Sequence, residues 1–160
     1  MNDMKMKKQP YICLVASSGG HIDELSQLSD VYSNFDVFYM VPKTKWTEQL
    51  TGKRYFISDM NRKNKITKLS SMIFMLAQQF RILLKEKPDV VITTGAAVAI
   101  PAAFFCKIAK KKLIYIESIC RVKTRSKTGN FMYGRADLFV VQWKELLSVY
   151  PNAVYGGNIY

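Results

Sequence analysis

Short, nearly continuous apolar runs recur along this chain and are separated by longer segments with helical spacing. The runs are five or six residues long and cover residues 11–16, 36–41, 54–58, 89–93, 113–117 and 138–142. Continuous rather than alternating apolar runs are typical of strands that are covered on both faces. Because strands alternate with helices, the pattern predicts an α/β fold with a single Rossmann-like, doubly wound parallel sheet of about six strands.

Helices are expected between these strands, at residues 22–28, 66–87 and 97–109, with short ones within 121–135 and at 143–149. Pro101 fits only the first turn of a helix, so the helix over 97–109 is expected to begin a few residues later than its pattern indicates. Two roles stay open for residues 155–160, a last strand or a contact with a partner. In the longest helix, six apolar residues follow the spacing of one face: Met72, Ile73, Leu76, Phe80, Leu83 and Leu84.

The 160 residues are expected to form one domain, 1–160, because 49% of them are apolar and supply a sizeable core. Twenty-four lysines and arginines against twelve acidic residues give a net charge of +12. This excess favours an anionic partner: a phosphorylated substrate, an anionic membrane surface or nucleic acid. No nucleic-acid recognition motif accompanies the charge, so nucleic acid is not expected as a partner.

The three cysteines, Cys13, Cys106 and Cys120, have no metal-ligand spacing, and neither a metal nor a cofactor is expected. Two of them fall in predicted buried elements, which indicates a reduced, cytoplasmic chain. Residues 1–10 are polar and lysine-rich, unlike a signal peptide. The most apolar stretch, 69–84, contains two glutamines and an arginine and is shorter than the roughly 20 residues of a transmembrane helix.

The segment after the first predicted strand carries the most specific chemical signal. Ser17, Ser18, Gly19, Gly20 and His21 lead from that strand into a helix, and the two glycines permit a sharp turn and a close approach of a ligand to the backbone. In open α/β folds, backbone N–H groups meet phosphate at such a turn. The segment is neither the dinucleotide fingerprint G-x-G-x-x-G nor a Walker loop. The alternative is a plain tight turn with a solvent-facing histidine, the only one in the chain.

Other strand ends deliver further polar residues to the same predicted edge of the sheet. Thr94 and Gly95 repeat the first turn and are a second candidate contact for phosphate, unless Thr94 is an ordinary helix N-cap. Glu117 ends an otherwise apolar strand, a partly desolvated setting that suits proton transfer. Alternatively, Glu117 pairs with Arg121 or a loop lysine and organises the loop. The fifth and sixth strands also bring Ser118, Gln142 and Trp143 to this edge.

Basic residues accompany two of these features. Residues 121–127 contain four cations and form either a phosphate clamp that begins at Arg121 or an ordinary solvated loop. The long helix has an apolar surface wider than a core stripe, and basic residues precede it. This combination suits a helix at a membrane interface, or a core helix that also packs on another subunit. The candidate residues for this contact are Met72, Ile73, Leu76 and Phe80, together with Arg62, Lys63, Lys65 and Lys68.

Four motifs, in this order, resemble the membrane-docking subunit of split GT-B glycosyltransferases. They lie at residues 15–21 (VASSGGH), 88–95 (PDVVITTG), 115–118 (YIES) and 136–143 (ADLFVVQW). The eukaryotic relative is the anchor half of the enzyme that adds the second N-acetylglucosamine to dolichol-linked oligosaccharide. Bacterial relatives are capsule and exopolysaccharide proteins that are described as glycosyltransferase enhancers.

The resemblance implies the N-terminal half of a GT-B glycosyltransferase, with the UDP-sugar shared with a donor-binding partner chain. It implies a polyprenyl-pyrophosphate-linked saccharide as the acceptor, capsule or exopolysaccharide biosynthesis as the setting, and peripheral attachment to the cytoplasmic face of the plasma membrane. His21 matches the histidine that closes the glycine-rich turn in this family. It is therefore the candidate catalytic base, because an imidazole can accept a hydroxyl proton near neutral pH, and Glu117 is the second candidate.

Two functions of different classes follow from this resemblance. In the first, the chain contributes acceptor binding and the catalytic base to a two-chain transferase. In the second, it is a non-catalytic scaffold that recruits an active transferase to the membrane. A Rossmann protein that binds a nucleotide by itself is disfavoured because the fingerprint glycines are absent.

Overall fold

The computed structural model describes residues 9–58 and 65–160, and only the backbone of residues 65–68. Its helices are α1 (Gly20–Ser26), α2 (Ser29–Tyr32), α3 (Lys65–Glu86), α4 (Ala99–Ala109) and α5 (Lys127–Met132), with 3₁₀ turns η1 (Thr47–Gln49) and η2 (Lys144–Ser148). Its strands are β1 (Ile12–Val15), β2 (Val37–Val41), β3 (Lys53–Phe56), β4 (Val90–Thr93), β5 (Lys112–Ile116), β6 (Leu138–Val141) and β7 (Val154–Tyr155).

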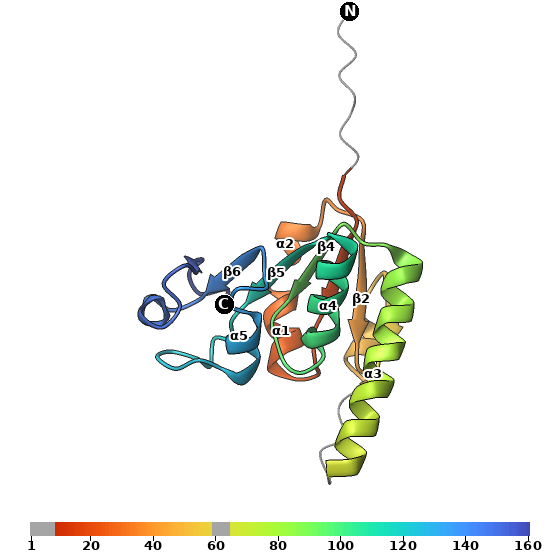
Figure 1. Cartoon of the computed structure of the whole chain (residues 1–160). Helices are drawn as coiled ribbons and strands as arrows, with labels where there is room; N and C mark the ends of the chain where they lie inside the picture. The colour runs from red at the N-terminus through yellow and green to blue at the C-terminus, as the bar shows by residue number, and fades with distance from the viewer. Residues whose placement is uncertain (1–8, 59–64) are drawn as a thin grey trace, which may run out of the picture.

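Within the described residues, the strands form one sheet in the order β3-β2-β1-β4-β5-β6-β7, and every pair is parallel (Figure 1). The direction in which the chain adds strands reverses between β1 and β4. Because all strands are parallel, their carboxyl ends lie at one edge, and the turns after β1 and β4 lie side by side there. This reversal point is where open α/β sheets bind their ligands.

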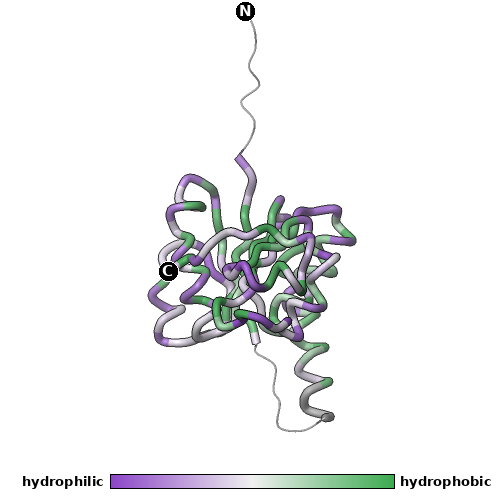
Figure 2. Tube along the Cα trace, turned by 90° about the vertical axis from the view of Figure 1, so that its left-hand side faces the viewer, coloured by the Kyte–Doolittle hydropathy of each residue, from purple (hydrophilic) through white to green (hydrophobic). Residues whose placement is uncertain are grey.

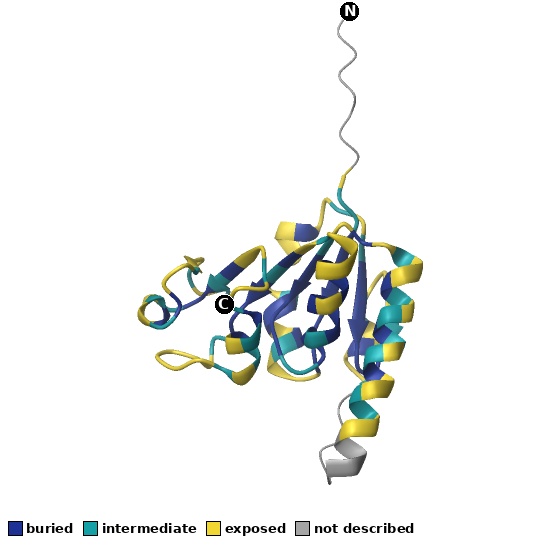
Figure 3. Cartoon of the chain, viewed as in Figure 1, coloured by how far each residue is buried: buried dark blue, intermediate teal, exposed yellow. Residues whose placement is uncertain are grey.

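Helices cover both faces of the sheet, as the continuous apolar strands predict. Along β1, Cys13 and Val15 pack with α3, α4 and α5, whereas Ile12 and Leu14 pack with α1 and α2 on the opposite face. The strands are the buried centre of the molecule in Figure 3, and in the trace of Figure 2 many hydrophobic segments lie in the interior. The doubly wound α/β class is therefore confirmed.

The end of the sheet, the first helix and helix α4 show where the observed elements depart from or agree with the predicted ones. The sheet has a seventh strand, β7, so one of the two roles left open for the last residues is correct for Tyr155. The helix predicted over 22–28 begins earlier, at Gly20, and is followed by a separate turn of helix, α2. Helix α4 begins at Ala99, as Pro101 predicts, because proline lacks the N–H that later turns of a helix require.

Helix α3 packs on the sheet through a face that only partly matches the predicted one, with Leu83 common to both. Met75, Gln79 and Leu83 are buried, whereas Ile73 and Leu84 are more than half exposed. Met72, Leu76 and Phe80 are partly buried, and the Phe80 ring packs edge-on against Phe105 of α4, with centroids 6.2 Å apart. Apolar residues surround most of this helix, so periodicity does not determine which face meets the sheet.

The carboxyl end of α3 is fixed by Glu86. Its carboxylate accepts hydrogen bonds from the Tyr11 hydroxyl (2.8 Å), from the Tyr55 hydroxyl and from the Lys53 ammonium. Burial alone raises the pKa of Glu86, but these three donors outweigh it and lower the pKa to about 2. The opposite, amino-terminal end of α3 projects past the edge at which the strands end (Figure 1).

Candidate functional site

The carboxyl ends of β1, β4 and β5 surround a cavity of about 820 Å³. It lies at the reversal point of the sheet, where α1, the turn before α4 and the loop after β5 approach one another. Its lining includes small, polar and ionisable side chains from all of these segments: Gly20, His21, Glu24, Ala96, Ala97, Ile100, Tyr115, Glu117, Ser118, Cys120, Arg121, Ser126, Lys127 and Thr128.

Two turns position His21 at this cavity. Gly19 has a φ of 80°, a conformation that glycine adopts without strain, and α1 begins at the next residue. The hydroxyl of Thr94 donates a 2.6 Å hydrogen bond to the carbonyl oxygen of His21, which ties the turn after β4 to the start of α1. Gly95 has a φ of 119°, and a Cβ atom there would lie 3.4 Å from Cε1 of the His21 ring. The imidazole therefore lies against backbone that has no side chain.

Thr94 does not cap α4, which contradicts one of its two predicted roles. Helix α4 begins five residues later, at Ala99, behind Val98, and no side chain caps it. Thr94 is fully buried, and its hydroxyl is used by the bond to His21. The structure thus makes Thr94 a support of the site rather than part of the cavity wall.

Glu117 is almost completely buried and accepts hydrogen bonds at both carboxylate oxygens. Oε1 accepts from the Ser118 N–H (3.0 Å) and from the Tyr115 hydroxyl (3.3 Å). Oε2 accepts from the Ser126 hydroxyl and from the Tyr150 hydroxyl, each at 3.0 Å. Glu117 therefore organises the loop, as one interpretation predicted, but through these donors and not through an ion pair with Arg121 or a lysine. Burial and this carboxylate both raise the pKa values of Tyr115 and Tyr150.

Glu24 connects α1 to the loop after β5. Its Oε1 accepts hydrogen bonds from the Ser118 hydroxyl (2.8 Å) and from the Ile119 N–H (3.1 Å). The residue is 1% exposed. Burial raises the pKa of Glu24, and the bonds from Ser118 and Ile119 partly oppose that shift.

The cations of the loop after β5 divide into two groups. Arg125 is structural, because its guanidinium donates to Asn130 (3.1 Å) and to the carbonyl of Val149 and lies over the rings of Tyr133 and Tyr150. Arg121 and Lys127, in contrast, line the cavity. They are the cationic side chains available to an anionic ligand there.

Only some of the residues predicted to bind a ligand line the cavity. Gly20, His21, Glu117, Ser118 and Arg121 line the cavity. The remaining candidates lie behind it or beside it in the two turns: Ser17, Ser18, Gly19, Thr94 and Gly95. The cavity also contains Lys127, from the predicted basic clamp, and residues that the sequence analysis did not select, among them Glu24, Ile100 and Tyr115. Glu24 lies three residues after His21 on one helix face, but acidic residues also favour the first turn of a helix, so the spacing by itself does not identify a site residue.

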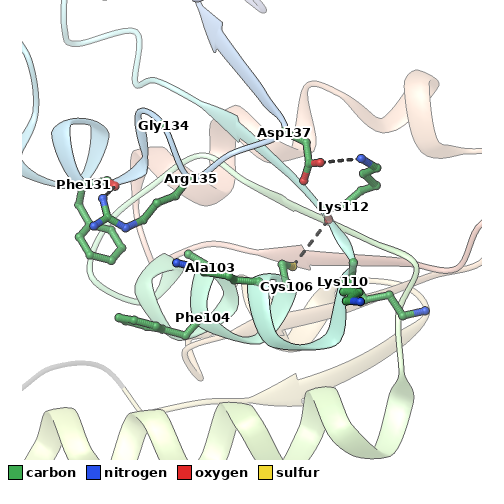
Figure 4. A pocket seen from close by; sticks show the side chains of 11 residues that line it. Ala103, Phe104, Cys106, Lys110, Lys112, Phe131, Gly134, Arg135 and Asp137 are labelled. Carbon is green, nitrogen blue, oxygen red and sulfur yellow. Dashed lines mark hydrogen bonds and ion pairs between the residues drawn. The ribbon is translucent and has the colours of Figure 1, made fainter.

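A second cavity, of about 510 Å³, lies at the opposite edge of the sheet (Figure 4). Cations surround it, but several are already engaged. Lys112 pairs with Asp137 at 2.6 Å, Lys111 pairs with Asp89 at 2.9 Å, and the Arg135 guanidinium stacks on Phe131. The polar and ionisable side chains at the carboxyl ends of the strands therefore line the first cavity and not the second.

Two further properties of the described part of the chain bear on the site. Residues 9–58 and 65–160 contain no cluster of three or more histidine, cysteine, aspartate or glutamate side chains arranged to hold a metal ion. No helix within these ranges has the length and apolar character needed to cross a membrane.

Comparison with known proteins identifies similar chains. A family model described as oligosaccharide biosynthesis protein Alg14 like matches residues 12–159. The human UDP-N-acetylglucosamine transferase subunit ALG14 is 27% identical over 190 residues, which cover 98% of this chain and 86% of the human protein.

Solved structures share the fold at low sequence identity. Acinetobacter baumannii MurG superposes with a TM-score of 0.69 and 14% identity over 93% of this chain and 44% of its own. The UDP-N-acetylglucosamine 2-epimerase from Rickettsia bellii superposes with a TM-score of 0.71 and 11% identity over 94% of this chain and 45% of its own. This chain thus spans less than half the length of either protein and has the fold of one half of a GT-B molecule.

Proposed function

This chain belongs to the Alg14-like family of oligosaccharide biosynthesis proteins, and we propose that it is one subunit of a two-chain glycosyltransferase. In this proposal the partner subunit binds most of a UDP-sugar, and this chain binds the acceptor, a saccharide linked to polyprenyl pyrophosphate. The similarity to proteins named as UDP-N-acetylglucosamine transferase subunits supports the reaction class. The setting we propose is capsule or exopolysaccharide biosynthesis.

The observation that carries the proposal is the cavity at the reversal point of the sheet. Its opening combines an imidazole, His21, with two cations, Arg121 and Lys127. A pyrophosphate-linked sugar needs cations for its phosphates and a base for the attacking hydroxyl. The neighbouring turn at Gly19, where a Cβ would meet nothing within 4 Å, allows a ligand to approach the backbone closely.

His21 is the proposed catalytic base. The acceptor hydroxyl attacks the anomeric carbon of the donor sugar, the bond from that carbon to the UDP oxygen breaks, and His21 takes the hydroxyl proton. Glu117 is less suited to this role, because four protein donors already occupy its carboxylate. We assign Glu117 to holding Ser126 and the loop after β5 in place.

The projecting end of α3 is the proposed membrane contact. The side chain of Gln78 bonds to the Phe56 carbonyl and the Ser58 N–H at the end of β3. The helix before the buried Met75, residues 65–74, is about 15 Å long and projects past the edge of the sheet (Figure 1). It exposes Ile73 and other apolar side chains, namely Leu69 and Phe74.

Basic residues were predicted at the same end of α3. Arg62 and Lys63 lie outside the described residues. Lys65 and Lys68 lie in α3, and the structure describes only their backbone. We propose that the apolar turns enter the interface of an anionic cytoplasmic leaflet and that these cations face its headgroups. Docked in this way, the cavity edge of the sheet faces the membrane that holds the acceptor.

The test is sugar transfer from radiolabelled UDP-sugars into membrane lipid. The assay compares this chain alone, a candidate donor-binding subunit alone, and the two together. Transfer only with both chains supports the two-subunit enzyme and identifies the sugar. Full transfer by the partner alone contradicts the catalytic role and leaves the scaffold function.

A His21→Ala variant separates the two functions further. The catalytic role predicts a large loss of turnover while partner binding and vesicle binding are retained. Asp23→Ala, a change on the exposed side of the same helix, is the matched control and should retain turnover. Unchanged turnover in His21→Ala would support the scaffold.

A further inference from the structure

Two buried polar atoms beside the cavity have no hydrogen-bond partner among the described residues. They are Nδ1 of His21 and Oε2 of Glu24. Buried polar atoms in native proteins are nearly always paired, so unpaired ones require an explanation. A carboxylate oxygen can only accept a hydrogen bond, whereas a histidine Nδ1 can donate one. The two unpaired atoms are therefore chemically complementary.

The helix places both side chains on one face, although Nδ1 and Oε2 are not hydrogen-bonded to each other in the structure. His21 and Glu24 are three residues apart in α1, a spacing at which Cβ atoms lie about 5–6 Å from each other on one helix face. The carboxyl group of Glu24 cannot swing away freely, because Ser118 and Ile119 hold its Oε1. On the other side, the His21 ring lies against Gly95, with Nδ1 3.7 Å from the place where a Cβ would be.

We propose that Glu24 is the positioning residue of His21: a small rotation of the two side chains lets Oε2 of Glu24 accept a hydrogen bond from Nδ1–H of the imidazole. This bond fixes the tautomer in which Nε2 carries the lone pair. Because Nδ1 is buried, Nε2 is the nitrogen through which the ring can act on a ligand. A carboxylate that orients a histidine in this way also stabilises the imidazolium formed after proton uptake.

The environment of Glu24 favours one further hydrogen-bond donor to its carboxylate. Burial is the main cause that raises the pKa of this carboxyl, and a bond from His21 would offset part of that cost. The other charged or titratable side chains that line the same cavity are Tyr115, Glu117, Cys120, Arg121 and Lys127. On the outer side, the C-terminal Tyr160 lies near Asp23 and Glu24.

The hydrogen bond can be tested without any enzyme assay, because His21 is the only histidine in the chain. A protein labelled with ¹⁵N-histidine gives a single imidazole spin system, whose nitrogen shifts and couplings report the tautomer directly. In mildly alkaline buffer we expect the proton on Nδ1. A proton on Nε2 in the wild-type protein would overturn the proposal, whatever the variants show.

Two variants, each of which removes one negative charge from α1, test the role of Glu24 in this measurement. Glu24→Ala should shift the imidazole toward the Nε2–H form, whereas Asp23→Ala, one residue away on the exposed side of the helix, should leave the wild-type tautomer. Equal spectra for both variants would refute the role of Glu24. A folded state is verified in the same samples from the backbone amide spectrum.

The catalytic consequence of the pair rests on the proposed function. In the reconstituted two-chain reaction, Glu24→Ala should lower kcat at least about tenfold, because the imidazole loses the carboxylate that orients it. If no transfer occurs with any sample, the proposed function fails while the tautomer measurement still decides the hydrogen bond. Normal kcat in Glu24→Ala, with transfer present, would contradict the positioning role.

Discussion

Replacing Gly129 by alanine should destabilise the protein, although alanine is the better helix former. Gly129 lies inside α5 and has no positive φ that would demand glycine. On propensity alone, the change from glycine to alanine in a helix stabilises by about 1 kcal/mol. A Cβ at this position, however, would lie 1.9 Å from Oε2 of Glu117 and 2.6 Å from the Tyr150 hydroxyl oxygen. The sign of the effect therefore tests the Glu117 network.

The magnitude follows from the bonds that the new methyl group displaces. Oε2 of Glu117 accepts from Ser126 and Tyr150, and a bond to a carboxylate is worth about 1.5–3 kcal/mol. Losing both, with some relaxation and the gain in propensity, gives a net loss of about 3 kcal/mol. For a chain of this size that corresponds to a fall in Tm of about 6–12 °C.

The measurement is thermal unfolding followed by circular dichroism. Gly20→Ala is the matched control, since Gly20 begins α1 and a Cβ there meets nothing within 4 Å; we expect it to retain the wild-type Tm. In a Glu117→Ala background, Gly129→Ala should cost much less, because the nearest atom is gone. A Tm at or above that of the wild type in Gly129→Ala would refute the reasoning.

Three further predictions address the helix docking, the membrane contact and the turn beneath the imidazole. Glu86→Gln should lower the free energy of unfolding by about 2 kcal/mol above pH 5; because the folded pKa of Glu86 is depressed, the difference should shrink as pH falls from 4.5 toward 2 in urea titrations. Ile73→Asp should weaken binding to anionic vesicles roughly 10-fold or more, whereas Leu84→Asp, equally exposed at the far end of α3, should bind normally in a sedimentation assay. Thr94→Val removes the bond to the His21 carbonyl and should cost about 1 kcal/mol in urea unfolding.

The strands and the edge that holds the cavity could be predicted from the sequence because their signals are local. A continuous apolar run followed by Gly19 and Gly20 specifies a buried strand and a sharp turn without knowledge of any distant residue. The parallel order then follows from the alternation of strands with helices. Local information of this kind places His21 at the sheet edge, as the structure does.

The features that could not be predicted depend on contacts between distant segments. Glu24 and Ser118 are 94 residues apart, and nothing near Glu24 in the sequence distinguishes it from an acidic residue that favours a helix start. The buried face of α3 is a similar case. Apolar residues lie on most sides of this helix, and the face that contains the polar Gln79 is the one that is buried. Only the packing against the sheet decides between the faces.

Some residues at the strand ends are used in hydrogen bonds within the protein, whereas others line the cavity. This arrangement supports a site that is completed by a second chain. Thr94 and Glu117 are fully engaged within the protein, and Gln142 donates to the Glu117 carbonyl behind them. These buried bonds hold the cavity wall in one arrangement before any ligand binds, which lowers the entropy cost of binding. His21 and Arg121, in contrast, face the opening. A rigid wall that presents the proposed base and a cation toward an open side fits the acceptor half of the two-chain enzyme that we propose.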